Sequence, residues 1–419
     1  MRISVKKILY FELICVFAIP FCTSVLGLPR NLLYIMDLIN VFLFIFGISR
    51  NKLYQQSNNY ITITMLSLAL CGLIGYMFFG TSFIQYLWGL RNILRFFVFL
   101  LNCYYCFDIS DIKIIWNCLY KLFFFNIIFG TVQYFVMGIS GDLLGGTFGT
   151  LMGASGYLVA LLALIITYTT SLYVCNKISL VKLLLTYAGI LYLSILAELK
   201  VMYLILVLVM FFTIMVTRPN IKTIMIVMCA FFALVFGLRL LSVLNPTSFS
   251  YVSSLDNLMY YLTNSYTAEG GFSRTDSIPK INELFFKDSI LKRIFGYGLG
   301  QCDYSNIPIL NSLFYQKYGS YNYRYFFYAM TYLEMGATGL VIYAYFYVKT
   351  LICTVKYRLD NYREFKIMTV MNIVIIIIMA IYNYTLRSDP GYIWMLACSV
   401  PLILKKSYLK ENKKCFLNE

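Results

Sequence analysis

Runs of about 20 apolar residues follow one another along almost the whole chain. They lie near residues 8–28, 31–48, 60–80, 84–107, 114–139, 155–174, 180–198, 200–217, 223–244, 325–352, 367–386 and 391–404. Each run is long enough to cross a hydrocarbon core of about 30 Å as an α-helix. The pattern therefore predicts an all-α, polytopic integral membrane protein with about twelve transmembrane helices.

One long polar segment interrupts this pattern between the ninth and tenth runs. The chain is thereby expected to divide into four parts. These are nine transmembrane helices over 1–244, a large extracytoplasmic loop over 245–324, three transmembrane helices over 325–404 and a basic cytoplasmic tail over 405–419.

Composition agrees with a membrane protein and removes several kinds of chemistry. Apolar residues make up 61% of the 419 residues and charged residues 12%, whereas soluble proteins average about 45–50% and about 25%. Histidine is absent, which excludes histidine bases, Ser-His triads and histidine metal sites. Of the twelve cysteines, all but Cys302 and Cys415 lie in or beside apolar runs, where cysteine is usually a packing residue.

Lysine and arginine predict the orientation. They gather at alternate ends of the runs, at Arg2, Lys6, Lys7, Arg50, Lys52, Lys113, Lys177, Lys182, Arg218, Lys222, Lys349, Lys356, Arg358, Arg363, Lys366, Lys405, Lys406, Lys410, Lys413 and Lys414. Because cytoplasmic loops carry an excess of such residues, both termini are expected in the cytoplasm and the 245–324 loop outside. The net charge of +16 reflects this asymmetry and the attraction to anionic inner-leaflet lipid, and does not indicate nucleic-acid binding.

Two arginines interrupt the fourth apolar run. Placing such a residue in a span costs about 2.5–3.5 kcal/mol, so each needs a reason to be there. Arg91 and Arg95 are four residues apart and share one helix face. Either they have a charge partner such as Asp37, or they reach the outer headgroups, or they form a cationic site for a diphosphate, to which the planar guanidinium is suited.

Further cations are predicted on the same side of the membrane, where the positive-inside rule would not place them. They are Lys200, in the turn Ala197-Glu198-Leu199-Lys200, Arg239 near the end of the ninth run, and Arg274 in the loop. A negatively charged ligand on that side would explain their position. Glu198 and Lys200 could instead pair with each other and help to form the turn.

Several short motifs occur in an order that resembles a known family, the Wzy-type O-antigen and capsular polysaccharide polymerases with the related O-antigen ligases. The resemblance covers the late external loop, Gly146-Thr147-Phe148-Gly149, Ala197-Glu198-Leu199-Lys200, Arg274, Phe295-Gly296-Tyr297-Gly298-Leu299-Gly300 and Glu334-x-Gly336-x-x-Gly339.

The resemblance implies a GT-C-like glycosyltransferase in the bacterial inner membrane. Such an enzyme moves a growing glycan from an undecaprenyl-diphosphate carrier onto a lipid-linked repeat unit, with a chain-length regulator protein as a further partner. It needs no nucleotide and no metal, because cationic side chains stabilise the diphosphate leaving group. In this interpretation the diphosphate contacts are Arg91, Arg95, Lys200, Arg239 and Arg274, the catalytic carboxylates are Glu334 and Glu198, and the loop contacts are Tyr297, Tyr323, Arg324 and Tyr325.

Several alternatives stay open at this point. The family's ligases have a histidine about nine residues before the glutamate, and that place falls near Tyr325, so a ligase is the weaker prediction. A lipid-linked-oligosaccharide flippase or another transporter is a further possibility. Glu334 could cap a helix or pair with Arg324, and tyrosine collects at membrane interfaces as well as at sugar-binding sites.

Overall fold

The structure, a computed structural model, describes residues 4–50, 59–216, 221–263, 271–356 and 362–417. All regular structure in these residues is helical. The predicted cytoplasmic cations Arg2, Lys52, Arg218 and Arg358 lie outside the described residues, as do residues 264–270 of the predicted loop.

Helices occur at each of the twelve predicted apolar runs. Their bounds are α1 (Val5–Ser24), α2 (Leu33–Arg50), α3 (Asn59–Phe79), α4 (Phe83–Cys106), α5 (Ile109–Phe135), α6 (Ala154–Val174), α7 (Leu180–Leu196), α8 (Lys200–Val216), α9 (Ile221–Leu244), α15 (Phe327–Lys356), α16 (Arg363–Tyr382) and α17 (Gly391–Leu417). Within the described residues, six of these, α3, α4, α5, α6, α15 and α16, are long and apolar enough to cross a membrane. The class of helical membrane protein is thus supported, and the count of twelve spans stays a prediction.

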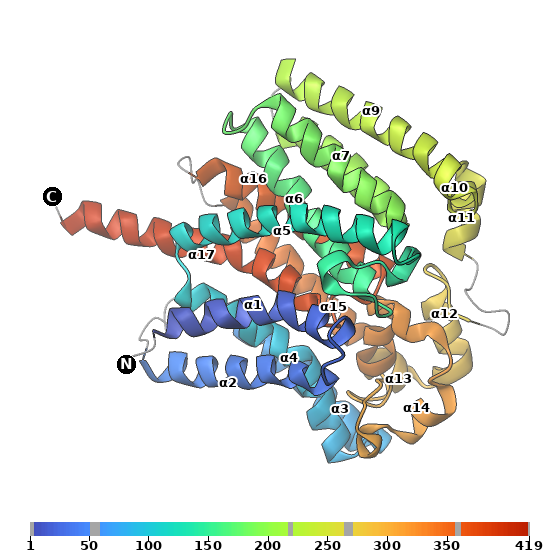
Figure 1. The fold of residues 1–419 in the computed structure, drawn as a ribbon. Helices are drawn as coiled ribbons and strands as arrows, with labels where there is room; N and C mark the ends of the chain where they lie inside the picture. Colours follow the sequence, from blue (N-terminus) through green and yellow to red (C-terminus); the bar gives the residue numbers. More distant parts are fainter. Residues whose placement is uncertain (1–3, 51–58, 217–220, 264–270, 357–361, 418–419) are drawn as a thin grey trace.

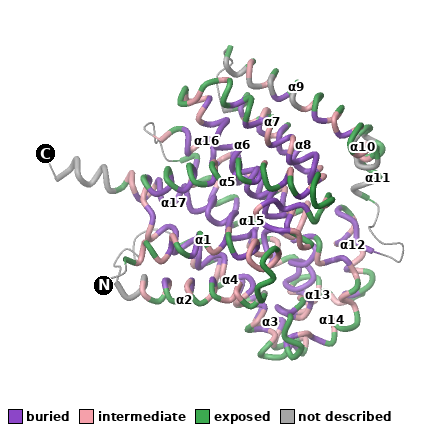
Figure 2. The backbone as a smooth tube through the Cα atoms, in the orientation of Figure 1, coloured by how far each residue is buried: buried purple, intermediate pink, exposed green. Residues whose placement is uncertain are grey.

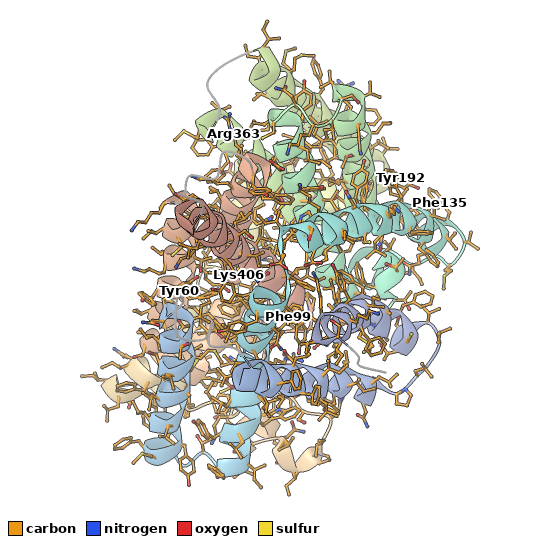
Figure 3. All side chains as sticks on the ribbon, turned by 90° about the vertical axis from the view of Figure 1, so that its left-hand side faces the viewer. Tyr60, Phe99, Phe135, Tyr192, Arg363 and Lys406 are labelled. Carbon is orange, nitrogen blue, oxygen red and sulfur yellow. The ribbon has the colours of Figure 1, made fainter. Side chains whose placement is uncertain are left out.

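The helices form a bundle with two distinct ends. In Figure 1 the start of α1 and the end of α17 lie at the left, and the helices of the predicted loop lie at the right. At the left-hand end Lys6 pairs with Asp111 at 2.5 Å, and the Lys406 ammonium donates to the backbone oxygen of Phe107 at 2.6 Å. Figure 3 views the molecule from this end, with Lys406 and Arg363 labelled. Lys6 and Lys406, which are predicted to be cytoplasmic, therefore lie at the end of the bundle away from the helices of the predicted loop.

Helix α6 is the centre of the bundle. Of its most apolar 18-residue window, 89% is buried, compared with 33% for α3 and α5. Figure 2 shows it among α5, α7, α8, α16 and α17. Apolar side chains point outward on the peripheral helices, for example Leu38, Leu66 and Phe236, as expected for helices in contact with lipid.

The segment predicted as a loop is a folded, helical unit. Its described part contains α10 (Pro246–Val252), α11 (Leu255–Thr263), α12 (Ser277–Ile281), α13 (Ile290–Phe295) and α14 (Leu313–Tyr318). Phe272, Phe286, Cys302 and Tyr323 form a second buried core with the first turns of α15. This stretch is polar in composition, but it folds as a compact cap on the end of the bundle. We call residues 271–326 the cap.

The described part of the predicted tail is helical. Helix α17 continues from the membrane run to Leu417 without a break.

Candidate functional site at the cap end of the bundle

The glycine motif of the cap passes between three helices. Gly296, Gly298 and Gly300 have φ values of +74°, +103° and +79°, a region that favours glycine. A Cβ atom on Gly89 of α4 would lie 2.3 Å from the nitrogen of Gly300, and one on Gly75 of α3 would lie 2.3 Å from the Cα of Gly298. The backbones are in direct contact here, which explains why the motif needs glycine.

A break in α15 provides hydrogen-bond acceptors for this turn. Gly336 has φ +61° and ψ −159°, so the helix is interrupted there. The carbonyls of Leu333 and Glu334 accept hydrogen bonds from Tyr297 and Gly298, each at 2.9 Å. The motif Glu334-x-Gly336, predicted to open a helix, therefore lies at a kink inside α15 and anchors the cap.

Glu334 has a different partner from the one expected. Its Oε1 accepts from the backbone N–H groups of Gly300 at 3.0 Å and Cys302 at 3.2 Å. Its Oε2 forms an ion pair with Arg387, and the exposed fractions of the two side chains are 0% and 1%. Glu334 thus neither caps the helix start nor pairs with Arg324. One of its oxygens holds the glycine turn and the other holds Arg387.

Arg387 belongs to a segment that the sequence interpretation overlooked, the junction between α16 and α17. Asp389 in this junction pairs with Arg95 of α4 at 2.9 Å. Directly after it, the Tyr392 hydroxyl donates to Asp37 of α2 at 3.0 Å. The sequence does contain a signal for this junction. Arg387 and Asp389 lie between two apolar runs and are followed by Pro390.

Arg91 and Arg95 are both ion-paired. Arg91 binds Asp37, and its guanidinium lies 4.7 Å from the Trp88 ring centre. Arg95 lies 4.0 Å from Asp37 in addition to its contact with Asp389. The Asp37 partnership considered from the sequence is therefore present, and Arg91 keeps 26% of its side chain exposed.

Arg274 is buried, whereas an arginine in a solvated loop would be exposed. Its exposed fraction is 7%, and its guanidinium lies 4.7 Å from the ring centre of Tyr382 at the end of α16. The Tyr328 hydroxyl donates to its backbone oxygen at 2.6 Å. Next to it, hydrogen bonds from Ser273 and Lys280 outweigh desolvation and lower the pKa of Asp276. Arg274 is thus fixed in place at the α16–α17 junction.

Lys200 extends this group. Glu198 has φ +52°, and it makes the tight turn that begins α8 at Lys200. The Lys200 ammonium lies 5.0 Å from the Tyr251 ring centre, and the charges of Glu198, Asp142 and Arg274 all act on it. The turn therefore places Lys200 where the charge of Arg274 acts on it.

Arg239 is the remaining predicted diphosphate contact. It is exposed on α9, and none of the ion pairs or ring contacts among the described residues includes it. The structure gives no support to its predicted role.

The predicted loop contacts separate into two kinds. The Tyr297 hydroxyl donates to the backbone oxygen of Phe285 at 2.6 Å, and that of Tyr323 to Cys302 at 2.9 Å. Burial raises the pKa of both phenols, and both rings pack in the second core. Tyr325 is 50% exposed, and Arg324 is half-buried at 5.0 Å from the Tyr315 ring centre. Only the last two predicted contacts lie where a ligand could reach them.

The motif at 146–149 is a packing element. Thr147 donates its backbone N–H to Asn126 of α5 at 2.9 Å, and Gly146 donates to Gln133 at 2.7 Å. Gly149 has φ +92° and lies against Ser24 of α1. The turn thus joins α1 and α5 at the cap end.

The fold and site define an α-helical membrane protein with a network of arginines and carboxylates under a folded cap. No protein-family model matches the chain, and no curated protein matches it.

Proposed function

We propose that this chain is a polysaccharide polymerase of the bacterial cytoplasmic membrane. It would transfer a growing glycan from an undecaprenyl-diphosphate carrier to the next lipid-linked repeat unit, on the outer side where the cap lies. The proposal rests on the motif resemblance together with the arrangement of cations at the cap end of the bundle.

The buried position of Arg274 is the observation that carries the proposal. A loop arginine that served only solubility would remain in water, yet Arg274 is placed against Tyr382 and beside the charge of Lys200. Ordering and desolvating a guanidinium in this way suits recognition of an anion, because its rigid fork is oriented before the ligand arrives. A lipid diphosphate is an anion that a membrane protein would meet at this depth.

The arginine and aspartate pairs supply a second means of holding the diphosphate. Arg91 is bound to Asp37 and is partly exposed, so a phosphate group arriving at this end could take over part of its hydrogen bonding. Arg387 is almost fully buried with Glu334, and Arg95 is 9% exposed beside Asp389, so both arginines are better suited to fixing the junction. We assign ligand contact to Arg274, Lys200 and Arg91, and a supporting role to the other two.

Deleting the chain from cells that make a surface polysaccharide tests the proposal. Single repeat units should then remain on the lipid carrier or on the final acceptor, because transport to the outer side is intact and only chain growth is lost. Long carrier-bound chains in the deletion strain would indicate a ligase. Repeat units trapped on the cytoplasmic leaflet would indicate a flippase.

A further inference from the structure

Asp303 is a carboxylate held at the glycine turn, and it has no ion-pair partner among the described residues. It follows Cys302, whose backbone N–H is bound by Glu334, and its side chain is half-buried. Its Oδ2 accepts from the Asn92 amide at 3.0 Å, and its Oδ1 accepts from the N–H of Tyr304 at 2.9 Å. None of the ion pairs among the described residues includes Asp303.

The other carboxylates near the junction are already held by cations. Asp37, Glu334 and Asp389 are each ion-paired to an arginine. Glu198, the other carboxylate predicted to be catalytic, lies within the field of Lys200. The buried Arg387, whose charge interacts with that of Asp303, is already paired with Glu334.

Asn92 links Asp303 to a proposed diphosphate contact. Arg91 donates to the Asn92 amide oxygen at 2.7 Å, and the Asn92 amide nitrogen donates to Asp303 at 3.0 Å. One amide side chain thus separates the cation from the carboxylate. In an inverting glycosyl transfer, the leaving diphosphate and the attacking hydroxyl lie on opposite sides of one sugar carbon, so a cation and a base are needed at short separation.

A second cation lies near the same carboxylate. The charges of Asp303 and Arg324 both act on Tyr384 in the α16–α17 junction, where burial first and then Asp303 raise the pKa of the phenol. Asp303 and Arg324 are both half-buried. Both side chains therefore keep surface that an acceptor sugar could reach.

We infer that Asp303 is the general base that activates the acceptor hydroxyl, an inference that rests on the proposed polymerase function. The acceptor O–H bond breaks and its proton passes to the Asp303 carboxylate. The acceptor oxygen forms a bond to the anomeric carbon of the donor, whose bond to the diphosphate oxygen breaks. The electron pair stays on the diphosphate, which leaves on its lipid, and Asp303 returns the proton to water.

The test uses the full-length chain reconstituted in liposomes. The substrate is the lipid-diphosphate-linked repeat unit isolated from cells that lack the chain. The variants are Asp303→Asn and Asp303→Ala, and the matched control is Asp288→Asn, an exposed aspartate of the same cap. The initial rate of glycosidic bond formation is measured with and without added formate.

Both Asp303 variants should be slower by about 100-fold or more, the range expected for loss of a general base. Formate should restore part of the rate in Asp303→Ala, because a small carboxylate can enter the space left by the side chain. The Asp288→Asn control should keep the wild-type rate.

Two results would overturn the inference while polymer still forms in the wild type. One is an Asp303→Ala rate within about threefold of the wild type. The other is a large loss that formate does not restore and that comes with lower thermal stability, since this indicates a positioning role through Asn92. A wild-type chain that forms no polymer would instead contradict the proposed function and remove the reaction in which Asp303 acts.

Discussion

Glu334 and Arg387 form a buried ion pair whose two halves depend on each other. Removing one partner leaves the other charge inside the protein without compensation, which typically costs about 3–5 kcal/mol. Glu334→Gln should therefore lower the midpoint of thermal unfolding of the purified protein strongly. The double variant Glu334→Gln with Arg387→Gln should recover part of the loss, because no unpaired charge remains.

The exposed residue Glu283 provides the control for this measurement, since Glu283→Gln should leave the unfolding midpoint unchanged. If Glu334→Gln unfolds at the wild-type temperature, the carboxylate does not anchor the cap. Such a result would also free Glu334 for the catalytic role that the sequence suggested.

Arg274 is predicted to act through the shape of its guanidinium as well as through its charge. Arg274→Lys keeps the charge but loses the fork, so polymer formation should fall by about tenfold or more at normal protein level. Arg274→Gln should lose more. The readout is the chain-length distribution of the surface polysaccharide in a complemented deletion strain.

Lys317→Gln on α14 is the matched control, because Lys317 is an exposed cation of the cap and exposed charges contribute only about 0–1 kcal/mol. Wild-type chain lengths from Arg274→Gln would remove Arg274 from the site.

At the scale of helices, the cap is attached through glycine-to-glycine backbone contact. A methyl group on Gly89 would meet the backbone of Gly300 at 2.3 Å, and backbone on both sides cannot move aside cheaply. Gly89→Ala should therefore displace the glycine turn, and it should abolish activity and lower stability even though alanine is a better helix former.

Gly237 of α9 is the comparison, because its added methyl would meet only side-chain atoms, those of Leu191 at 3.3 Å and Tyr203 at 3.5 Å. Gly237→Ala should keep both activity and the unfolding midpoint. Equal activity and equal unfolding midpoints of the two alanine variants would contradict the backbone contact between α4 and the glycine turn.

The helices could be predicted from the sequence because apolar runs of membrane length are a local signal. The same reasoning placed Arg91 and Arg95 on one face and named Asp37 as a partner, which the structure contains. It could not find the Glu334–Arg387 pair, whose members are 53 residues apart. Nor could it separate Asp303 from other loop aspartates, since its setting depends on Asn92 in a distant helix.

The folding of the cap could not be predicted from the sequence for a different reason. Its residues have no membrane-length apolar run, so composition suggested an open loop. Phe272 and Tyr323 nevertheless come together across the segment, with ring centres 6.2 Å apart, and close a small core on the first turns of α15. A core assembled from scattered aromatic residues leaves no periodic signal in the sequence.

For the whole molecule, we predict that the cap faces the outside of the cytoplasmic membrane. Leu313 on the cap is 83% exposed and Val181 at the start of α7 is 65% exposed. An impermeant maleimide should label Leu313→Cys in intact cells whose outer barrier is opened, and should label Val181→Cys only after lysis. The reverse pattern would place the proposed site in the cytoplasm.

Cys302 serves as an internal reference in this experiment. It is fully buried, and burial raises the pKa of its thiol well above the usual range, so little reactive thiolate forms. The unsubstituted chain should therefore gain no label at Cys302 until it is unfolded.

In the proposed function the chain alone lengthens a glycan, and each new glycosidic bond is formed as the bond between a glycan and its lipid diphosphate breaks. The most direct test of this function is to supply the reconstituted full-length protein with the lipid-diphosphate-linked repeat unit and to count both products. The account predicts a ladder of glycan lengths, with one lipid diphosphate released for each new glycosidic bond. Movement of intact repeat units across the bilayer, with neither ladder nor released lipid diphosphate, would contradict it.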